Sequence, residues 1–163
     1  MKHRLLVALL SLSILSGCYA NARFYPVKGP LSAQAPLPIF TAKMSGIGKN
    51  GDISLALADG ETGKGRWSMV EPVQSPNGAT TSNTSATSSM ASLWDTIYGP
   101  GFYVSHVLGA RLYAESVVTG DRGTVLNVEF YRDEHERPEH DNVARTIKGV
   151  AKDNKDNIYK VVF

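Results

Sequence analysis

Apolar and polar residues alternate along most of the chain after residue 38, which is the period of a β-strand with one buried face. The alternation is regular over residues 53–57 and over 125–131, where Leu126, Val128 and Phe130 share one parity. Further strand-like stretches cover residues 39–44, 65–70, 111–119, 146–151 and 158–163, with turn signals such as Asp59-Gly60 between stretches. The pattern predicts an all-β fold of six to eight short antiparallel strands. A small barrel or a sandwich would protect the edges of such strands.

Residues 74–92 interrupt this pattern. Ten of these nineteen residues are Ser or Thr, and Met90 is the one large apolar side chain among them. Such a segment buries too little apolar surface to offset its loss of conformational entropy. We therefore expect a flexible, disordered insertion at about 74–92. A short helical turn is predicted over residues 92–98, where Leu93, Trp94 and Ile97 have helical spacing.

The first 17 residues have the parts of a secretory signal peptide. A basic start at residues 2–4 precedes an apolar run over 5–15, which is too short to cross a bilayer, because a spanning helix needs about 20 residues. Residues 15–18, Leu-Ser-Gly-Cys, resemble the lipobox of bacterial lipoproteins. The resemblance implies cleavage before Cys18, a diacylglyceryl group on its thiol and a third acyl chain on the new amino group.

Lipid on Cys18 would make the membrane the first partner of the chain. Two or three acyl chains hold a protein firmly, because each buried CH₂ contributes about 0.8 kcal/mol. Cys18 is the only cysteine, so it forms no internal disulfide. In such lipoproteins a residue other than Asp after the cysteine, here Tyr19, implies the outer membrane. We expect a lipid-anchored protein of the bacterial envelope that faces the periplasm.

Three segments follow from these patterns. The signal peptide covers residues 1–17, a Pro-rich tether covers 18–38, and a β domain covers 39–163. The tether is predicted because proline-rich segments are extended and semi-rigid; its prolines are Pro26, Pro30, Pro36 and Pro38.

The mature chain would carry no net charge. Lys2 and Arg4 account for the whole formal charge of +2, since no Asp or Glu precedes Cys18. A neutral surface argues against a nucleic-acid partner, which needs an excess of Lys and Arg. It also argues against a polybasic attachment to anionic lipid.

Two sequences resemble catalytic motifs but lack the context that their chemistry needs. Residues 46–51 match G-x-G-x-x-G, yet an alternating strand follows where a nucleotide site needs a helix, so we predict a β-turn. His135 and His140 are five apart with Pro138 between them, whereas a zinc-protease helix places them four apart. A looser metal site that uses His135, His140 and a neighbouring carboxylate is the alternative to a solvated charged loop.

Aromatic and acidic residues supply the other candidates. Trp94, Tyr98, Phe102 and Tyr103 could line a cleft or a partner-binding patch, and the alternative is that they belong to the core. Glu115 and Glu129 could form a carboxylate pair across the sheet. A nucleophile-elbow sequence is absent, and we predict no cofactor.

The domain resembles small β-rich lipoproteins of unknown function from Gram-negative bacteria, through residues 59–61, 65–67, 120–123 and 149–153. This resemblance implies a fold rather than an activity. Periplasmic lysozyme inhibitors are a similar family, but they usually hold a disulfide, which this chain cannot make. We therefore expect a non-enzymatic binding or structural module with a partner in the envelope. The alternatives are a metal-dependent hydrolase that uses His135 and His140, and an inhibitor of an envelope hydrolase.

Overall fold

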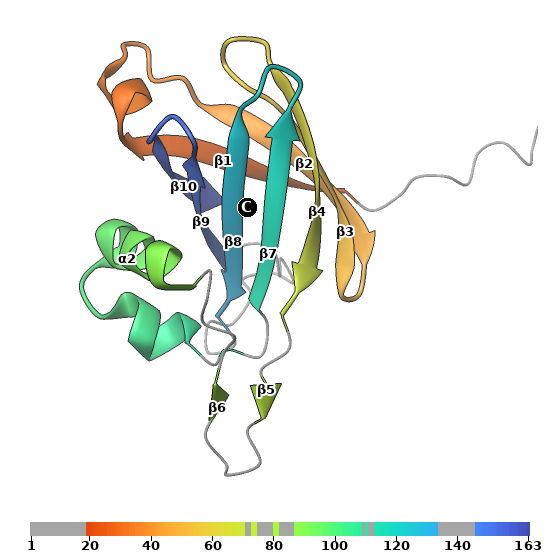
Figure 1. Cartoon of the computed structure of the whole chain (residues 1–163), viewed down its shortest axis with the longest axis vertical. Coiled ribbons are helices and arrows are strands. Elements are labelled where there is room, and N and C mark those ends of the chain that lie inside the picture. The colour runs from red at the N-terminus through yellow and green to blue at the C-terminus, as the bar shows by residue number, and fades with distance from the viewer. Residues whose placement is uncertain are drawn as a thin grey trace, which may run out of the picture.

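The computed structural model describes residues 19–70, 73–74, 80–81, 87–108, 110, 113–133 and 146–163. Eight strands close into an antiparallel barrel in which consecutive barrel strands pair and β1 pairs with β10 (Figure 1). The barrel strands are β1 (Tyr19–Lys28), β2 (Phe40–Ile47), β3 (Asn50–Ala56), β4 (Thr62–Met69), β7 (Tyr113–Gly120), β8 (Val125–Arg132), β9 (Ile147–Asp153) and β10 (Ile158–Val162). The predicted all-β fold is confirmed in its barrel form, in which every barrel strand has a neighbour on both sides.

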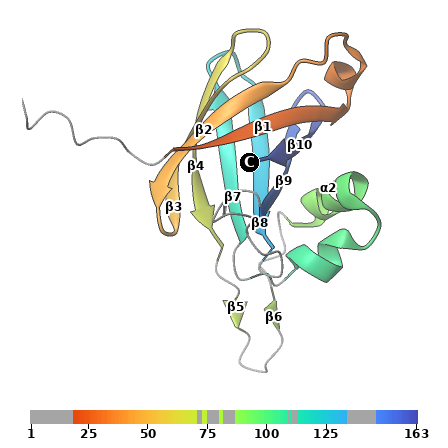
Figure 2. The same cartoon turned by 180° about the vertical axis from the view of Figure 1, so that it is seen from behind.

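Helical segments cover one side of the outer wall. The helix α2 (Thr87–Tyr98) and a π-helical turn, η2 (Tyr103–Val107), lie on the side of β9 in both views (Figures 1 and 2). A 3-10 turn, η1 (Pro30–Ala33), follows β1, and β5 (Val73–Gln74) pairs with β6 (Thr80–Thr81) in a separate ribbon. In the described part of the chain, no helix is long and apolar enough to cross a membrane.

The helix α2 begins inside the range that we predicted as a flexible insertion. Residues 87–92 of that range are helical, and residues 75–79 and 82–86 lie outside the described residues. The predicted helical turn over 92–98 is therefore the second half of a longer helix. The Ser and Thr residues before Ser92 obscured its start, because these side chains disfavour helix interiors in sequence-based assignment.

Alternate residues of the strands fill the barrel, as a side-chain period of two requires. The rings of Phe24 and Phe40 stack with centroids 4.9 Å apart, and Tyr159 meets Phe40 edge-on at 5.4 Å. The other buried members of this cluster are Ala22, Ala42, Met44, Ile53, Leu55, Val118, Leu126, Val128, Phe130, Ala151 and Val161. The middle of the barrel is therefore a packed core.

A second core lies between α2 and the outer face of the barrel. Trp94 is fully buried and meets Tyr131 edge-on at 6.3 Å. Glu129 and Tyr131 lie on the face of β8 that points away from the barrel interior, where alternation predicts exposure to solvent. They are nevertheless only 5% and 4% exposed. The prediction of one buried face for this strand was thus incomplete, because a helix from elsewhere in the chain covers the other face.

The predicted tether over 18–38 is wrong for Tyr19–Lys28, which form β1. This strand pairs with β2 along its first half and with β10 along its second half. Ala22 and Phe24 are buried at a spacing of two, a signal that the nearby prolines hid. Pro26 adjoins an irregularity in the β1–β10 register, the kind of position that tolerates a residue without an N–H donor. The barrel therefore begins one residue after Cys18.

A buried carboxylate ties two turns together at one end of the barrel. Glu61 is fully buried and accepts hydrogen bonds from the hydroxyl and N–H of Thr124 and from the N–H of Arg122. Lys155 lies 3.6 Å from its Oε2. These contacts, led by the Thr124 hydroxyl, lower the pKa of Glu61 to about 2 and outweigh the opposite effect of burial. Glu61 is therefore ionised, and it joins the β3–β4 turn to the β7–β8 turn.

Further polar bonds close the same end. Asp153 accepts bonds from the Tyr159 hydroxyl at 2.7 Å and from the Asn157 side chain at 2.9 Å. The Asn157 side chain in turn accepts the N–H of Leu31 in η1 at 2.8 Å. The opposite end of the barrel holds the β2–β3 hairpin and the start of β1, where Tyr19 pairs with Ser45.

Candidate functional site

The end of the barrel opposite Glu61 holds an apolar hollow of about 430 Å³, which we call the open-end hollow. Strands β1, β2, β4, β7, β8 and β9 contribute to its wall. Its apolar lining includes Tyr19, Ala20, Met44, Trp67, Ala114, Phe130, Ile147 and Phe163. The mouths of β-barrels are common sites for small ligands, and the volume falls in the usual range of about 300–1,000 Å³. The hollow is therefore the first candidate site.

Trp67 is held firmly in the wall of the open-end hollow. Its indole N–H donates to the carbonyl oxygen of Ser45 at 2.9 Å. Gly51 pairs with Trp67 across β3 and β4, and a Cβ at Gly51 would lie 2.6 Å from the indole nitrogen and 1.8 Å from the Ser45 oxygen. Glycine at this position therefore lets the indole approach the neighbouring backbone.

Arg132 is the one charged residue in the described lining of the hollow. It continues the inward-facing parity of Leu126, Val128 and Phe130 along β8. Its Nε is buried and has no hydrogen-bond partner among the described residues. A buried donor without a partner is unfavourable by about 1–3 kcal/mol. The hollow thus combines apolar walls with a single unsatisfied cationic donor.

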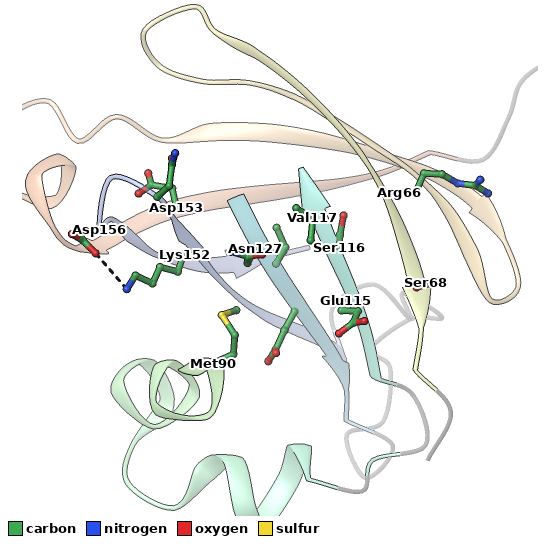
Figure 3. A pocket seen from close by; sticks show the side chains of 13 residues that line it. Arg66, Ser68, Met90, Glu115, Ser116, Val117, Asn127, Lys152, Asp153 and Asp156 are labelled. Carbon is green, nitrogen blue, oxygen red and sulfur yellow. Dashed lines mark ion pairs between the residues drawn. The ribbon is translucent and has the colours of Figure 1, made fainter. Parts of the chain in front are cut away.

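A second concavity of about 760 Å³ lies on the outer wall and crosses β4, β7, β8 and β9 (Figure 3). Most of its lining residues are polar or charged, including Arg66, Ser68, Glu115, Asn127, Glu129, Lys152 and Asp156, and Met90 of α2 lies at its edge. Two of its cations already have partners. Lys152 lies 3.4 Å from Asp156, and Arg66 lies 3.9 Å from Asp52.

Glu115 and Glu129 are direct partners on β7 and β8, as the predicted carboxylate pair requires. Oε2 of Glu129 accepts the indole N–H of Trp94 at 2.7 Å, and the Tyr113 hydroxyl also bonds to this carboxyl. Burial raises the pKa of Glu129, and the negative charge of Glu115 adds to that increase; the bonds from Tyr113 and Trp94 oppose it. Burial also raises the pKa of Tyr113, which the neighbouring Glu129 reinforces.

These contacts assign Glu129 to the support of α2 rather than to the binding of a ligand. Its acceptor oxygens bond to a helix residue and to a residue of the adjacent strand, and its side chain is buried. Both cations of the outer groove therefore have acidic partners, whereas Nε of Arg132 in the open-end hollow has no hydrogen-bond partner in the described part of the chain. We treat the open-end hollow as the better candidate site.

The four aromatic residues predicted as a binding set all lie in or beside the second core. Trp94 stacks on Tyr98 at 5.5 Å, and Tyr98 stacks on Phe102 at 4.8 Å. His106 continues this stack, 4.4 Å from Phe102. The N–H of Tyr103 donates to the side chain of Asp95 at 2.9 Å, and Tyr103 is buried. The structure thus brings these rings together as packing between the helical segments and the barrel, and their role in binding stays a prediction.

Tyr98 also contacts the barrel directly. Its hydroxyl donates to the carbonyl oxygen of Gly149 at 3.3 Å, and the Lys160 ammonium lies 5.2 Å from the centre of its ring. Burial raises the pKa of Tyr98 to about 12. The phenol is therefore a neutral donor that fixes α2 to β9 and β10.

The predicted metal ligands His135 and His140 lie outside the described residues, as does Cys18. Among the residues that the structure does describe, no three His, Cys, Asp or Glu side chains are grouped so that they could hold a metal ion.

Sequence reasoning missed the open-end hollow and Arg132. The available signal was parity, since Arg132 is two residues after Phe130 in an alternating strand. The predicted strand over 125–131 ends one residue before Arg132, and β1, which contributes Tyr19 and Ala20 to the hollow, falls within the predicted tether. Comparison with protein-family models, with curated protein sequences and with solved structures found no match to this chain, so the site rests on its own geometry.

Proposed function

We propose that this chain is a lipid-anchored protein of the bacterial envelope that binds a ligand in the open-end hollow and catalyses no reaction. One observation carries the proposal. The first barrel strand starts at Tyr19, directly after the predicted lipid-bearing Cys18, and Tyr19 itself lines the hollow. An anchor on Cys18 would therefore hold this end of the barrel at the membrane surface.

The position of Tyr19 suits such an interface. Its side chain is 65% exposed at the rim of the hollow, and tyrosine combines an apolar ring with a polar hydroxyl, which suits the boundary between lipid and water. The rest of the barrel supports a binding role, because the packed interior and the polar bonds at the closed end make a rigid wall around a preformed site.

Intact mass and membrane fractionation test the anchor. The parent chain is compared with Cys18→Ala, both produced in a Gram-negative bacterium. We expect the parent to begin at Cys18, to carry the added mass of acyl chains and to fractionate with membranes. The variant should keep its signal peptide or lose the acyl mass.

The variant should leave the barrel unchanged, since Cys18 precedes the first strand. Equal thermal midpoints for the two purified proteins would show that a change in fractionation reflects the lipid. A parent chain that is cleaved, soluble and free of acyl groups would contradict the proposal.

A further inference from the structure

The open-end hollow has the dimensions and surface of a site for one hydrocarbon chain. Its volume of about 430 Å³ lies near the lower end of the range for small-molecule sites, so it suits one acyl chain rather than a whole two-chain lipid. Trp67, Phe130 and Phe163 contribute aromatic surface to it. The rings of Phe130 and Phe163 meet edge-on at 5.4 Å, which packs Phe163 against the inner face of β8.

Arg132 places a positive charge in this apolar site, which favours a ligand that carries a negative charge. The guanidinium belongs to the inward-facing row of β8, and its buried Nε has no partner among the described residues. Asp133, the next residue, does not meet this need, because its carboxylate bonds to Lys148 at 3.3 Å. A ligand with an anionic head and an apolar chain would meet both requirements. Its head would accept a hydrogen bond from the guanidinium, and its chain would fill the hollow.

The source of such a ligand follows from the start of β1. Cys18 is separated from Tyr19 by a single peptide bond, so a lipid anchor there leaves no linker between the bilayer and the rim of the hollow. We infer that the open-end hollow takes up one acyl chain of an anionic membrane lipid and that Arg132 binds the negative charge of its head. This inference rests on the proposed function, since it takes the open end to face the membrane.

Contact quenching in solution tests the site itself. A chain that begins at Tyr19 keeps all eight barrel strands and can be titrated with a dibrominated stearate, whose bromines quench an indole on contact. Trp67 lines the hollow, whereas Trp94, the other tryptophan, is buried in the second core. We expect saturable quenching that disappears in Trp67→Phe. Stearate that quenches neither tryptophan would overturn the assignment.

A dibrominated stearyl alcohol, which has the same hydrocarbon chain but no negative charge, shows how much of the binding depends on the charge. Arg132→Gln should weaken binding of the stearate by about tenfold or more, as for loss of a charged hydrogen bond, and leave binding of the alcohol unchanged. Arg66→Gln is the matched control, because this exposed arginine lies on the outer wall, and it should bind both probes as the parent does. Equal losses for acid and alcohol in Arg132→Gln would refute the role of the charge. The variant should fold, since Nε of Arg132 makes no hydrogen bond to any residue that the structure describes.

An experiment with the lipid-anchored protein shows whether the bound acyl chain comes from the membrane. Full-length lipidated protein is placed in phosphatidylglycerol vesicles whose acyl chains carry bromines near their middle. Quenching of Trp67 that is lost in Trp67→Phe is the expected result. Stearate binding in solution without quenching in vesicles would assign the hollow to free fatty acid and overturn the membrane source. The mass of the chain at Cys18 reports the anchor separately, so failure here is distinguishable from failure of the proposed function.

Discussion

The indole N–H of Trp94 donates to Oε2 of Glu129 over 2.7 Å and joins α2 to the outer face of β8. Both side chains are buried, with exposures of 0% and 5%. The same carboxyl bonds to the hydroxyl of Tyr113 on the adjacent strand. One acidic side chain thus holds a helix and two strands together, and several measurable consequences depend on it.

Glu129→Leu should destabilise the fold by about 1–3 kcal/mol or more, because it leaves the buried Trp94 N–H without an acceptor. Chemical unfolding measures the change. Glu115→Leu is the matched control, since it removes an exposed carboxylate from the position directly opposite, and we expect a change within about 0.5 kcal/mol. Equal losses for the two variants would show that the Trp94 bond does not stabilise the helix.

Glu129→Gln should change how stability depends on pH. Burial raises the pKa of Glu129 above its ordinary value of 4.5, so the folded protein holds this proton more tightly than the unfolded chain does. The stability from that proton is present at low pH and is lost as pH rises through the folded pKa. The variant, which stays neutral, should therefore gain stability relative to the parent as pH rises above 4.5. Unfolding midpoints that stay parallel across this range would contradict the shift.

Glu61 should make the main contribution to the loss of folding stability at acid pH. Its pKa is lowered from 4.5 to about 2, so its stabilising contribution is complete above pH 4.5 and is lost as pH falls towards about 2. Glu61→Gln removes this dependence, and its unfolding midpoint should change less than that of the parent between these limits. A parent and variant with the same acid response would show that the Thr124 and Arg122 bonds do not hold the charge.

Gly51→Ala should disturb the wall of the open-end hollow. The new methyl would overlap the Ser45 carbonyl oxygen and press on the Trp67 indole, so we expect a loss of about 1–3 kcal/mol or more. The fluorescence of Trp67 should also change, because its bond to Ser45 is displaced. Gly48→Ala, in the same hairpin, offers a comparison without a steric clash, although its positive φ of 80° adds backbone strain. A Gly51→Ala variant with unchanged stability and unchanged Trp67 fluorescence would disprove the close approach of Gly51 to Ser45 and Trp67.

Most of the barrel could be predicted from alternation alone. The stretches that became β2, β3, β4, β7, β8, β9 and β10 each show a period of two or a short apolar run between turn residues. The predicted turn at Asp59-Gly60 lies between β3 and β4. Of the turn predicted over residues 46–51, only Gly48 and Lys49 lie between strands, because residues 46–47 and 50–51 are paired ends of β2 and β3. Local periodicity sufficed there because one face of each strand meets the same core.

The errors and omissions share one physical origin, which is contact between distant parts of the chain. The partner of β1 at the barrel seam is the last strand, so Ala22 and Phe24 looked isolated among prolines. Glu129 was a polar position until α2 covered it, and Arg132 became part of a site only when Tyr19 and Phe163 met it at the same end of the barrel. Such contacts depend on closure of the barrel, which no single segment encodes.

The seam between β1 and β10 also determines when the barrel can close. β1 and its partner β10 are the first and the last strands of the barrel in sequence order. Until Ile158–Val162 arrive, β1 and β9 each present an unpaired edge, and the chain is an open sheet that is prone to associate with other chains. The barrel therefore cannot close part by part, because both open edges are covered only when this five-residue strand pairs with them.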